Sequence, residues 1–129
     1  MNFGHLVHVV GITLMAMSVA LGGAAAVAAA YTEGEAFAFL ATAALTFAVG
    51  FIAFRRTKLV RDLSVREGYA VVALSWIAVG ITGAIPYLLA GVIRSPVAAL
   101  FESVSGFTTT GATVFAHIES LPRGVLFWR

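Results

Sequence analysis

The amino-acid sequence predicts an all-α integral membrane protein with three transmembrane helices, a short re-entrant helix followed by an extended loop, and the start of a fourth transmembrane helix. Of the 129 residues, 60% are hydrophobic and 11% are charged, with a mean hydropathy of +0.99, whereas about a quarter of a soluble domain is charged. Three long runs carry no charged residue, and about 20 helical residues cross a bilayer core. Inside this apolar chain, Ser105–Thr113 is rich in hydroxyls and also holds glycines.

The first uncharged run covers residues 6–30 and is long enough to cross a membrane. Its small residues at Gly22–Ala26 suit close helix packing in lipid, although a generic alanine-rich span has the same composition. The Ala-x-Ala pattern at 26–30 also occurs at signal-peptidase sites. Residues 1–8 contain no Lys or Arg, however, and the run exceeds the about 7–15 apolar residues of a signal sequence. We therefore expect a retained first helix.

The second uncharged run covers residues 36–54 and follows a short acidic turn that contains Glu33 and Glu35. A turn this short predicts that the first two helices are antiparallel neighbours. The third uncharged run covers residues 68–93. These runs divide the chain into an N-terminal helix pair with a basic loop, residues 1–67, and a helix–loop–helix unit, residues 68–129.

The loop of residues 55–67 sets the expected orientation in the membrane. Cytoplasmic loops of membrane proteins carry an excess of Lys and Arg. The loop, and with it the N-terminus, is therefore expected in the cytoplasm and the acidic turn outside. A patch for anionic lipid is the alternative role of such a loop, and the topological role is favoured. The bases are Arg55, Arg56, Lys58, Arg61 and Arg66, and the acids are Asp62 and Glu67.

Residues 94–121 are too polar for a full span and too short to cross the membrane twice, which leaves a re-entrant hairpin. Ser95 followed by Pro96 is typical of an N-cap and a first helical position. A helix over 97–107 would be about 16 Å long, half of a bilayer core. Thr108–Thr113 would return in extended form, because β-branched residues disfavour helix and Gly111 can adopt a positive φ.

Residues Leu121–Arg129 predict the outer start of a fourth helix, with Pro122 in its first turn. Arg129 would already lie at membrane depth, where a charge is costly. It is either paired or functional there, or it snorkels to the interface, and the sequence leaves both readings open.

The stretch Ser105–Thr113 has the composition of a potassium selectivity filter. Potassium channels replace the hydration shell of the ion with rings of backbone carbonyls, to which four loops contribute. The carbonyls of Thr109, Thr110, Gly111 and Ala112 are the expected potassium ligands. Threonine hydroxyls would complete the lowest site, so the candidate ion-binding residues are Thr108, Thr109, Thr110, Gly111, Ala112 and Thr113. One such segment cannot enclose an ion, so three more filter segments are needed.

Two residues of the short helix are candidates for its support. Glu102 is a lone carboxylate that either hydrogen-bonds the backbone of the loop or raises the local cation concentration. The first role is favoured, because a buried acid needs hydrogen-bond donors. Ser103 is placed with it as a supporting residue.

Other chemistries find weak support. Gly106 and Gly111 have the spacing of a phosphate-binding P-loop, but Ala112-Thr113 replaces its Lys-Ser/Thr pair. His5 and His8 lie one helical turn apart without a third metal ligand nearby, and the chain has no cysteine. The net charge of +2 is too small to indicate nucleic acid. No catalytic constellation and no cofactor motif is present, so we do not expect an enzyme.

The motif Phe101–Thr113, FESVSGFTTTGAT, resembles the first pore loop of the TrkH branch of the Trk/Ktr/HKT superfamily of potassium transporters. Residues 66–69 and 121–129 resemble the flanks of that loop. The resemblance implies four helix–pore loop–helix repeats with pseudo-fourfold symmetry, of which residues 68–129 are the first, incomplete at its C-terminal end. The family's filter glycine falls on Gly111. Sodium-conducting plant relatives have serine there, so glycine favours potassium.

The resemblance also implies a setting: a multi-pass protein of the bacterial inner membrane whose filter opens to the outside. Potassium is then the transported substrate, the full-length protein forms a homodimer in membrane lipid, and a cytoplasmic nucleotide-binding subunit of the TrkA type faces the side of residues 55–66. The expected function is potassium uptake, with this chain supplying one of four filter segments. The alternative is a small membrane scaffold or assembly subunit that transports nothing.

Overall fold

The structure, a computed structural model, describes residues 3–58 and 64–129. Within these ranges every regular element is helical and none is a strand. Three helices have the length and apolarity of membrane spans, in agreement with the predicted fold class. The elements in chain order are α1 (Phe3–Ala30), α2 (Ala36–Arg56), α3 (Val65–Leu89), α4 (Pro96–Phe107), the 3₁₀ helix η1 (Ile118–Ser120) and α5 (Arg123–Trp128).

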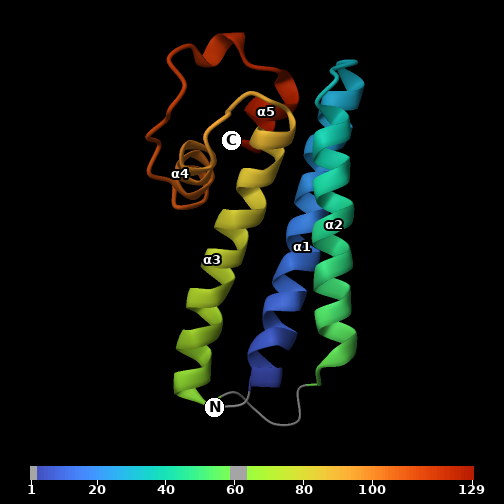
Figure 1. Cartoon of the computed structure of the whole chain (residues 1–129), viewed down its shortest axis with the longest axis vertical. Coiled ribbons are helices and arrows are strands. Elements are labelled where there is room, and N and C mark those ends of the chain that lie inside the picture. Colours follow the sequence, from blue (N-terminus) through green and yellow to red (C-terminus); the bar gives the residue numbers. More distant parts are fainter. Residues whose placement is uncertain (1–2, 59–63) are drawn as a thin grey trace.

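The three long helices stand side by side and alternate in direction (Figure 1). The predicted antiparallel neighbours α1 and α2 share the most extensive contact in the described chain. The α1–α2 turn and the C-terminal end of α3 lie at the same end of the molecule, which we call the turn end. α4 is seen nearly end-on beside the upper half of α3, so its axis crosses those of the long helices. The chain then climbs back to the turn end, where α5 begins.

Helix α3 differs from the predicted run of residues 68–93 at both ends. It begins at Val65 because Ser64 and Glu67 form a capping box: the backbone N–H of Glu67 donates to Ser64 Oγ at 3.4 Å, and the backbone N–H of Ser64 donates to Glu67 Oε2 at 3.0 Å. The sequence places Glu67 in the basic loop, whereas the structure places it in the first helical turn. The helix ends at Leu89, and Gly91 then has a φ of +71°, the left-handed conformation common after helix ends.

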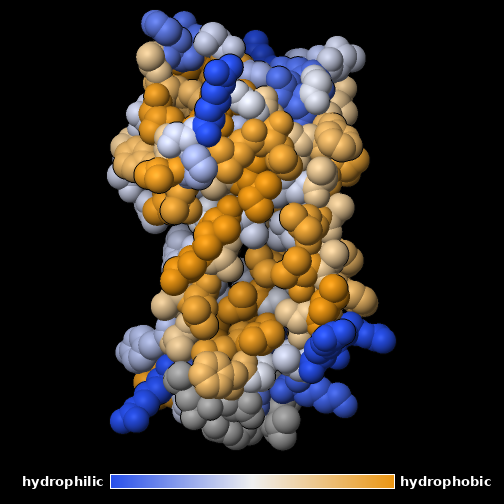
Figure 2. Space-filling view, in the orientation of Figure 1, coloured by the Kyte–Doolittle hydropathy of each residue, from blue (hydrophilic) through white to orange (hydrophobic). Residues whose placement is uncertain are grey.

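The surface has the polarity expected of a membrane protein. Figure 2 shows a broad apolar belt between two hydrophilic ends. Large apolar side chains are exposed along the long helices, among them Val19 on α1, Phe37 on α2 and Tyr69 on α3. The predicted basic loop includes Arg61 and Asp62, which lie outside the described residues.

Helices α1 and α2 approach most closely where Gly11 faces Gly50. A Cβ atom added to Gly50 would lie 2.7 Å from the backbone oxygen of Gly11, and one added to Gly11 would lie 2.8 Å from the oxygen of Gly50. Small residues allow such close backbone approach between membrane helices. This crossing holds the helix pair together in the half of the molecule away from the turn end.

We therefore expect Gly50→Ala to destabilise the full-length protein by about 1–3 kcal/mol, the usual cost of forcing extra methyl groups into a packed interface. Thermal unfolding of the purified protein in detergent measures it. Gly22→Ala is the matched control, because a Cβ atom at Gly22 on α1 would have no neighbour within 4 Å. Equal melting temperatures for the two variants would contradict this packing.

The apolar core lies toward the turn end and draws on all five α-helices. Leu21 of α1, Phe39 of α2 and Ala99 of α4 are fully buried, and Tyr87 of α3 is nearly so. Val125 of α5 is fully buried in the same cluster. The core therefore holds α4 against α3 and α5 against α1, close to the polar stretch that the sequence singles out.

Candidate functional site

Helix α4 is positioned by its own cap and by a close fit against α3. Ser95 Oγ accepts a hydrogen bond from the backbone N–H of Ala98 at 3.4 Å, and Pro96 is the first helical residue, as predicted. On the buried face of α4, Ser103 Oγ donates to the backbone oxygen of Gly80 at 2.9 Å. A Cβ atom at Gly83 would lie 2.5 Å from Ser103 Oγ, so glycine permits this approach. Ser103 thus holds α4 on α3.

The chain leaves α4 in a tight turn formed by Thr108, Thr109 and Thr110. Thr108 Oγ1 donates to the backbone oxygen of Val104 at 2.7 Å and lies 2.8 Å from Thr110 Oγ1. Thr109 has a φ of +56°, a left-handed conformation that few non-glycine residues adopt. Such strained residues cluster at functional sites, where the surrounding structure holds them in place.

Thr108 and Thr109 form a turn, so the extended form predicted over Thr108–Thr113 is wrong for these two residues. Residues 111–114, which we call the return, follow this turn, and the φ of +77° at Gly111 confirms the predicted positive φ. Ser105 holds both the turn and the return on α4. The Ser105 backbone oxygen accepts from the N–H of Thr110 at 3.0 Å, and the Ser105 hydroxyl donates to the backbone oxygen of Ala112 at 2.6 Å. Residues 108–112 are exposed in this chain. The return is therefore held from the side of α4 and open on its other side.

Glu102 is the buried charge of the site, with 1% of its surface exposed. Its carboxylate accepts hydrogen bonds from Thr113 Oγ1 at 3.0 Å, from the backbone N–H of Val114 at 2.9 Å and from Arg129 Nε at 2.6 Å. Burying a carboxylate is costly unless it is paired and hydrogen-bonded. Here the guanidinium of Arg129 compensates the charge of Glu102, and the hydroxyl of Thr113 and the N–H of Val114 donate hydrogen bonds to its carboxylate oxygens. Glu102 thus connects α4, the return and the end of α5.

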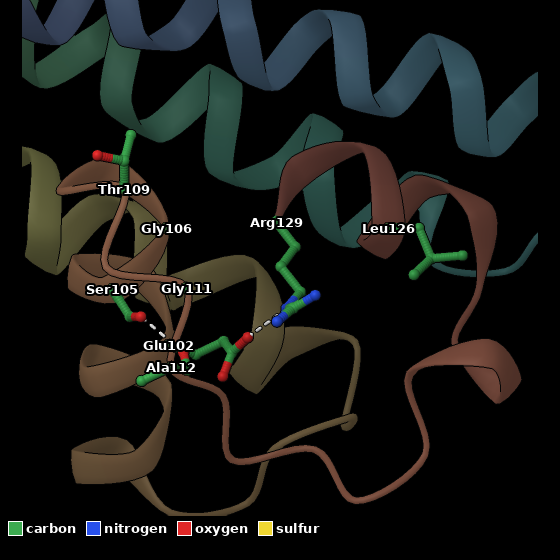
Figure 3. A pocket seen from close by; sticks show the side chains of 8 residues that line it. All are labelled: Glu102, Ser105, Gly106, Thr109, Gly111, Ala112, Leu126 and Arg129. Carbon is green, nitrogen blue, oxygen red and sulfur yellow. Dashed lines mark hydrogen bonds and ion pairs between the residues drawn. The ribbon is translucent and has the colours of Figure 1, made fainter.

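A pocket of about 210 Å³ lies between α4, the return and α5. In Figure 3, Arg129 and Glu102 point toward each other across it, and the Ser105 hydroxyl points toward Ala112. Trp128 Nε1 donates to the backbone oxygen of Gly83 at 3.1 Å and so fixes the end of α5 on α3. The lining residues are Glu102, Ser105, Gly106, Thr109, Gly111, Ala112, Leu126 and Arg129.

The structure places the candidate ion-binding residues Thr108–Thr113 next to one another, in the turn after α4 and the return that follows it. Glu102 holds the return, and Ser103 holds α4 on α3. The hydroxyl of Thr113 faces Glu102 and also accepts the N–H of Phe115 at 3.1 Å. The Thr113 hydroxyl therefore helps to hold the return in place. Of the two readings open for Arg129, the structure favours the paired one.

Ser105 is a supporting residue that sequence reasoning missed, although it lies inside the stretch. Pro122 also differs from its expected place: it precedes α5 as the N-cap, with a ψ of 148°, and is not in the first turn.

Comparisons with known proteins identify the family and the fold of the chain. A family model described as TrkH, a cation transport protein, matches residues 35–129. The chain belongs to the TrkH family. It is 32% identical to the Trk system potassium uptake protein TrkH of Halomonas elongata and 34% identical to TrkG of Escherichia coli K12, in both cases over the whole of this chain.

Among solved structures, the crystal structure of the potassium transporter TrkH from Vibrio parahaemolyticus superposes with a TM-score of 0.92 at 34% sequence identity, over 99% of this chain. The present chain covers 28% of that structure. It likewise spans 27% of the Halomonas TrkH. The match to the TrkH family thus concerns about a quarter of a longer relative, and this quarter contains the turn and return described above.

Proposed function

We propose that the full-length protein takes up potassium across a membrane and that Thr108–Thr113 is one of four segments of its selectivity filter. The observation that carries the proposal is the return at Gly111, left-handed and exposed on one side while Ser105 and Glu102 hold it on the other. Its support comes from the family, whose members with 32–35% identity over the whole chain are named potassium uptake proteins.

The proposed ligands of the ion are the backbone carbonyls of Thr109, Thr110, Gly111 and Ala112. Carbonyl rings replace the hydration shell of potassium in filters of this kind. The Ala112 oxygen accepts the Ser105 hydroxyl, and its second lone pair remains for an ion. The hydroxyl of Thr108 completes the lowest ion site of the filter. Thr113 does not bind the ion in this proposal; its hydroxyl donates to Glu102 and holds the return in place.

Three further walls must complete the filter, because one segment cannot surround an ion. We propose that they come from three more helix–pore loop–helix repeats, as in the family, with residues 68–129 belonging to the first and residues 1–67 forming the additional helix pair. The many exposed apolar side chains of the described chain are consistent with further helices and lipid around it. No enzymatic step and no cofactor is part of the proposal.

The proposed setting is the bacterial inner membrane. The N-terminus and residues 55–67 would lie in the cytoplasm, under the positive-inside rule, and the filter would open outward. A homodimer with a TrkA-type nucleotide-binding subunit on the cytoplasmic side is proposed from the family resemblance.

The test is potassium uptake by the full-length gene product in a bacterial strain that lacks its own uptake systems. We expect growth at low potassium and accumulation of ⁸⁶Rb⁺, with an empty vector as the control. Abundant protein in the membrane without growth or ⁸⁶Rb⁺ uptake would contradict the proposal and favour the alternative, a membrane scaffold that transports nothing.

A further inference from the structure

The turn between α1 and α2 holds the first residues of α5. Glu33 Oε1 accepts the backbone N–H of Arg123 at 2.7 Å, and Glu33 Oε2 accepts the N–H of Gly124 at 2.9 Å. The first N–H groups of a helix have no partner within the helix, and a carboxylate both satisfies them and suits the positive end of the helix dipole. Pro122, the residue at the N-cap of α5, makes no side-chain capping bond. The cap is therefore supplied from 90 residues away.

Packing around this cap leaves α5 little freedom. A Cβ atom at Gly124 would lie 2.6 Å from Cβ of Ala28, so the start of α5 is in close contact with α1. The guanidinium of Arg123 lies over the ring of Tyr31, 5.9 Å from its centroid. Val125 is fully buried in the core. The first turn of α5 thus packs against the C-terminal end of α1 and the α1–α2 turn.

The other end of α5 reaches the return after Gly111. Arg129 directly follows this six-residue helix, and its backbone N–H donates to the oxygen of Val125 at 3.0 Å. A Cβ atom at Gly106 of α4 would lie 2.8 Å from the backbone oxygen of Arg129, so this end of α5 fits closely against α4. The Arg129 side chain pairs with Glu102, which holds the N–H of Val114.

We propose that Glu33 is a positioning residue for the filter: it seats α5 so that Arg129 meets Glu102, and Glu102 then fixes Thr113 and Val114 at the end of the return. The N-terminal helix pair would thereby influence the geometry of the return through α5. The transport part of this inference rests on the proposed function, and its structural part does not.

Hydrogen exchange of the full-length protein in nanodiscs tests the structural part. For Glu33→Gln we expect faster exchange in residues 122–129 and also in residues 108–116, each by about fivefold, the factor that a lost cap of about 1 kcal/mol gives. Glu35→Gln is the matched control, because Glu35 lies in the same turn and makes no side-chain capping bond. Glu33→Asp keeps the charge with a shorter reach, and we expect an intermediate effect in both segments.

Cation selectivity is the second readout, measured as the ratio of potassium to sodium uptake at equal amounts of protein in the membrane. We expect Glu33→Gln to lower this ratio severalfold and Glu35→Gln to leave it unchanged. Faster exchange confined to residues 122–129, or a selectivity that stays constant while the protein becomes less abundant, would overturn the inference, since the cap would then stabilise α5 alone. If the unsubstituted protein takes up no potassium, the proposed function fails and exchange in residues 108–116 alone decides the inference.

Discussion

Gly111→Ser in the full-length protein is expected to reduce the preference for potassium over sodium by about tenfold, with uptake retained. The left-handed conformation costs a residue with a Cβ atom about 1–2 kcal/mol, and 1.4 kcal/mol corresponds to a factor of ten. Gly111 has a φ of +77°, and a Cβ atom there would meet no other part of the described chain within 4 Å, so this chain leaves room for the serine side chain and the strain falls on the backbone. Relief of that strain turns the carbonyls of Gly111 and its neighbours away from the ion. Competitive uptake of potassium and sodium in proteoliposomes measures the change.

Gly91 provides a matched control for this experiment. Its φ is +71°, and a Cβ atom there would also have no neighbour within 4 Å, but it lies in the connection between α3 and α4. Gly91→Ser therefore introduces a similar backbone strain outside the filter, and we expect unchanged selectivity. A similar loss of selectivity in both variants would show that general destabilisation causes it. Unchanged selectivity in Gly111→Ser would refute the assignment of the filter.

Glu102→Ala is expected to abolish most potassium uptake and to destabilise the protein. Removing one partner of a buried ion pair costs about 3–5 kcal/mol, because the remaining charge is left uncompensated. The cost here is at the lower end of that range, because the Arg129 side chain keeps 23% of its surface exposed. Here Arg129 would lose its partner, and the N–H of Val114 and the hydroxyl of Thr113 would lose their acceptor. The return would no longer be held at its end. Uptake of ⁸⁶Rb⁺ per molecule in the membrane and thermal unfolding in detergent measure the two effects.

A double-mutant cycle that combines Glu102→Ala with Arg129→Ala measures the interaction energy of the ion pair separately from the other contacts of the two residues. If the ion pair carries the effect, the double variant costs less than the sum of the two single variants. Glu119→Ala, which removes an exposed acid of η1, is the control and should behave as the unsubstituted protein does. Normal uptake by Glu102→Ala would exclude Glu102 from the support of the filter.

The spans could be predicted from the sequence because lipid imposes a simple requirement: long apolar runs between polar ends. The predicted runs at 6–30 and 36–54 correspond to α1 and α2 with small shifts at their ends. The helix predicted over 97–107 corresponds to α4, because Ser95 and Pro96 form a local start signal. Prediction was poorer at the start of α3, where the charge of Glu67 suggests a loop although its side chain caps the helix.

The connections between distant residues could not be predicted in the same way. Arg129 and Glu102 are opposite charges in apolar surroundings, which is a usable hint, but their pairing depends on how α5 packs against α4. Glu33 is separated from α5 in the chain by three α-helices and the 3₁₀ helix η1, and nothing in the turn around it indicates a cap. The left-handed φ of Thr109 also has no local signal, since threonine disfavours that conformation. Tertiary packing decides all three.

The ion pair between Glu102 and Arg129 has a consequence for the valence of the cation. Calcium and magnesium sites in proteins rely on carboxylate charge, whereas potassium filters rely on carbonyl dipoles. Glu102 is the one acid among the residues that line the pocket in the described chain, and its charge is neutralised by a guanidinium at 2.6 Å. In the proposed filter, this segment would therefore offer a cation oriented dipoles with little net charge. Such a surface would give a divalent ion poor compensation for its much larger dehydration cost, and it would favour monovalent ions before any selection by size.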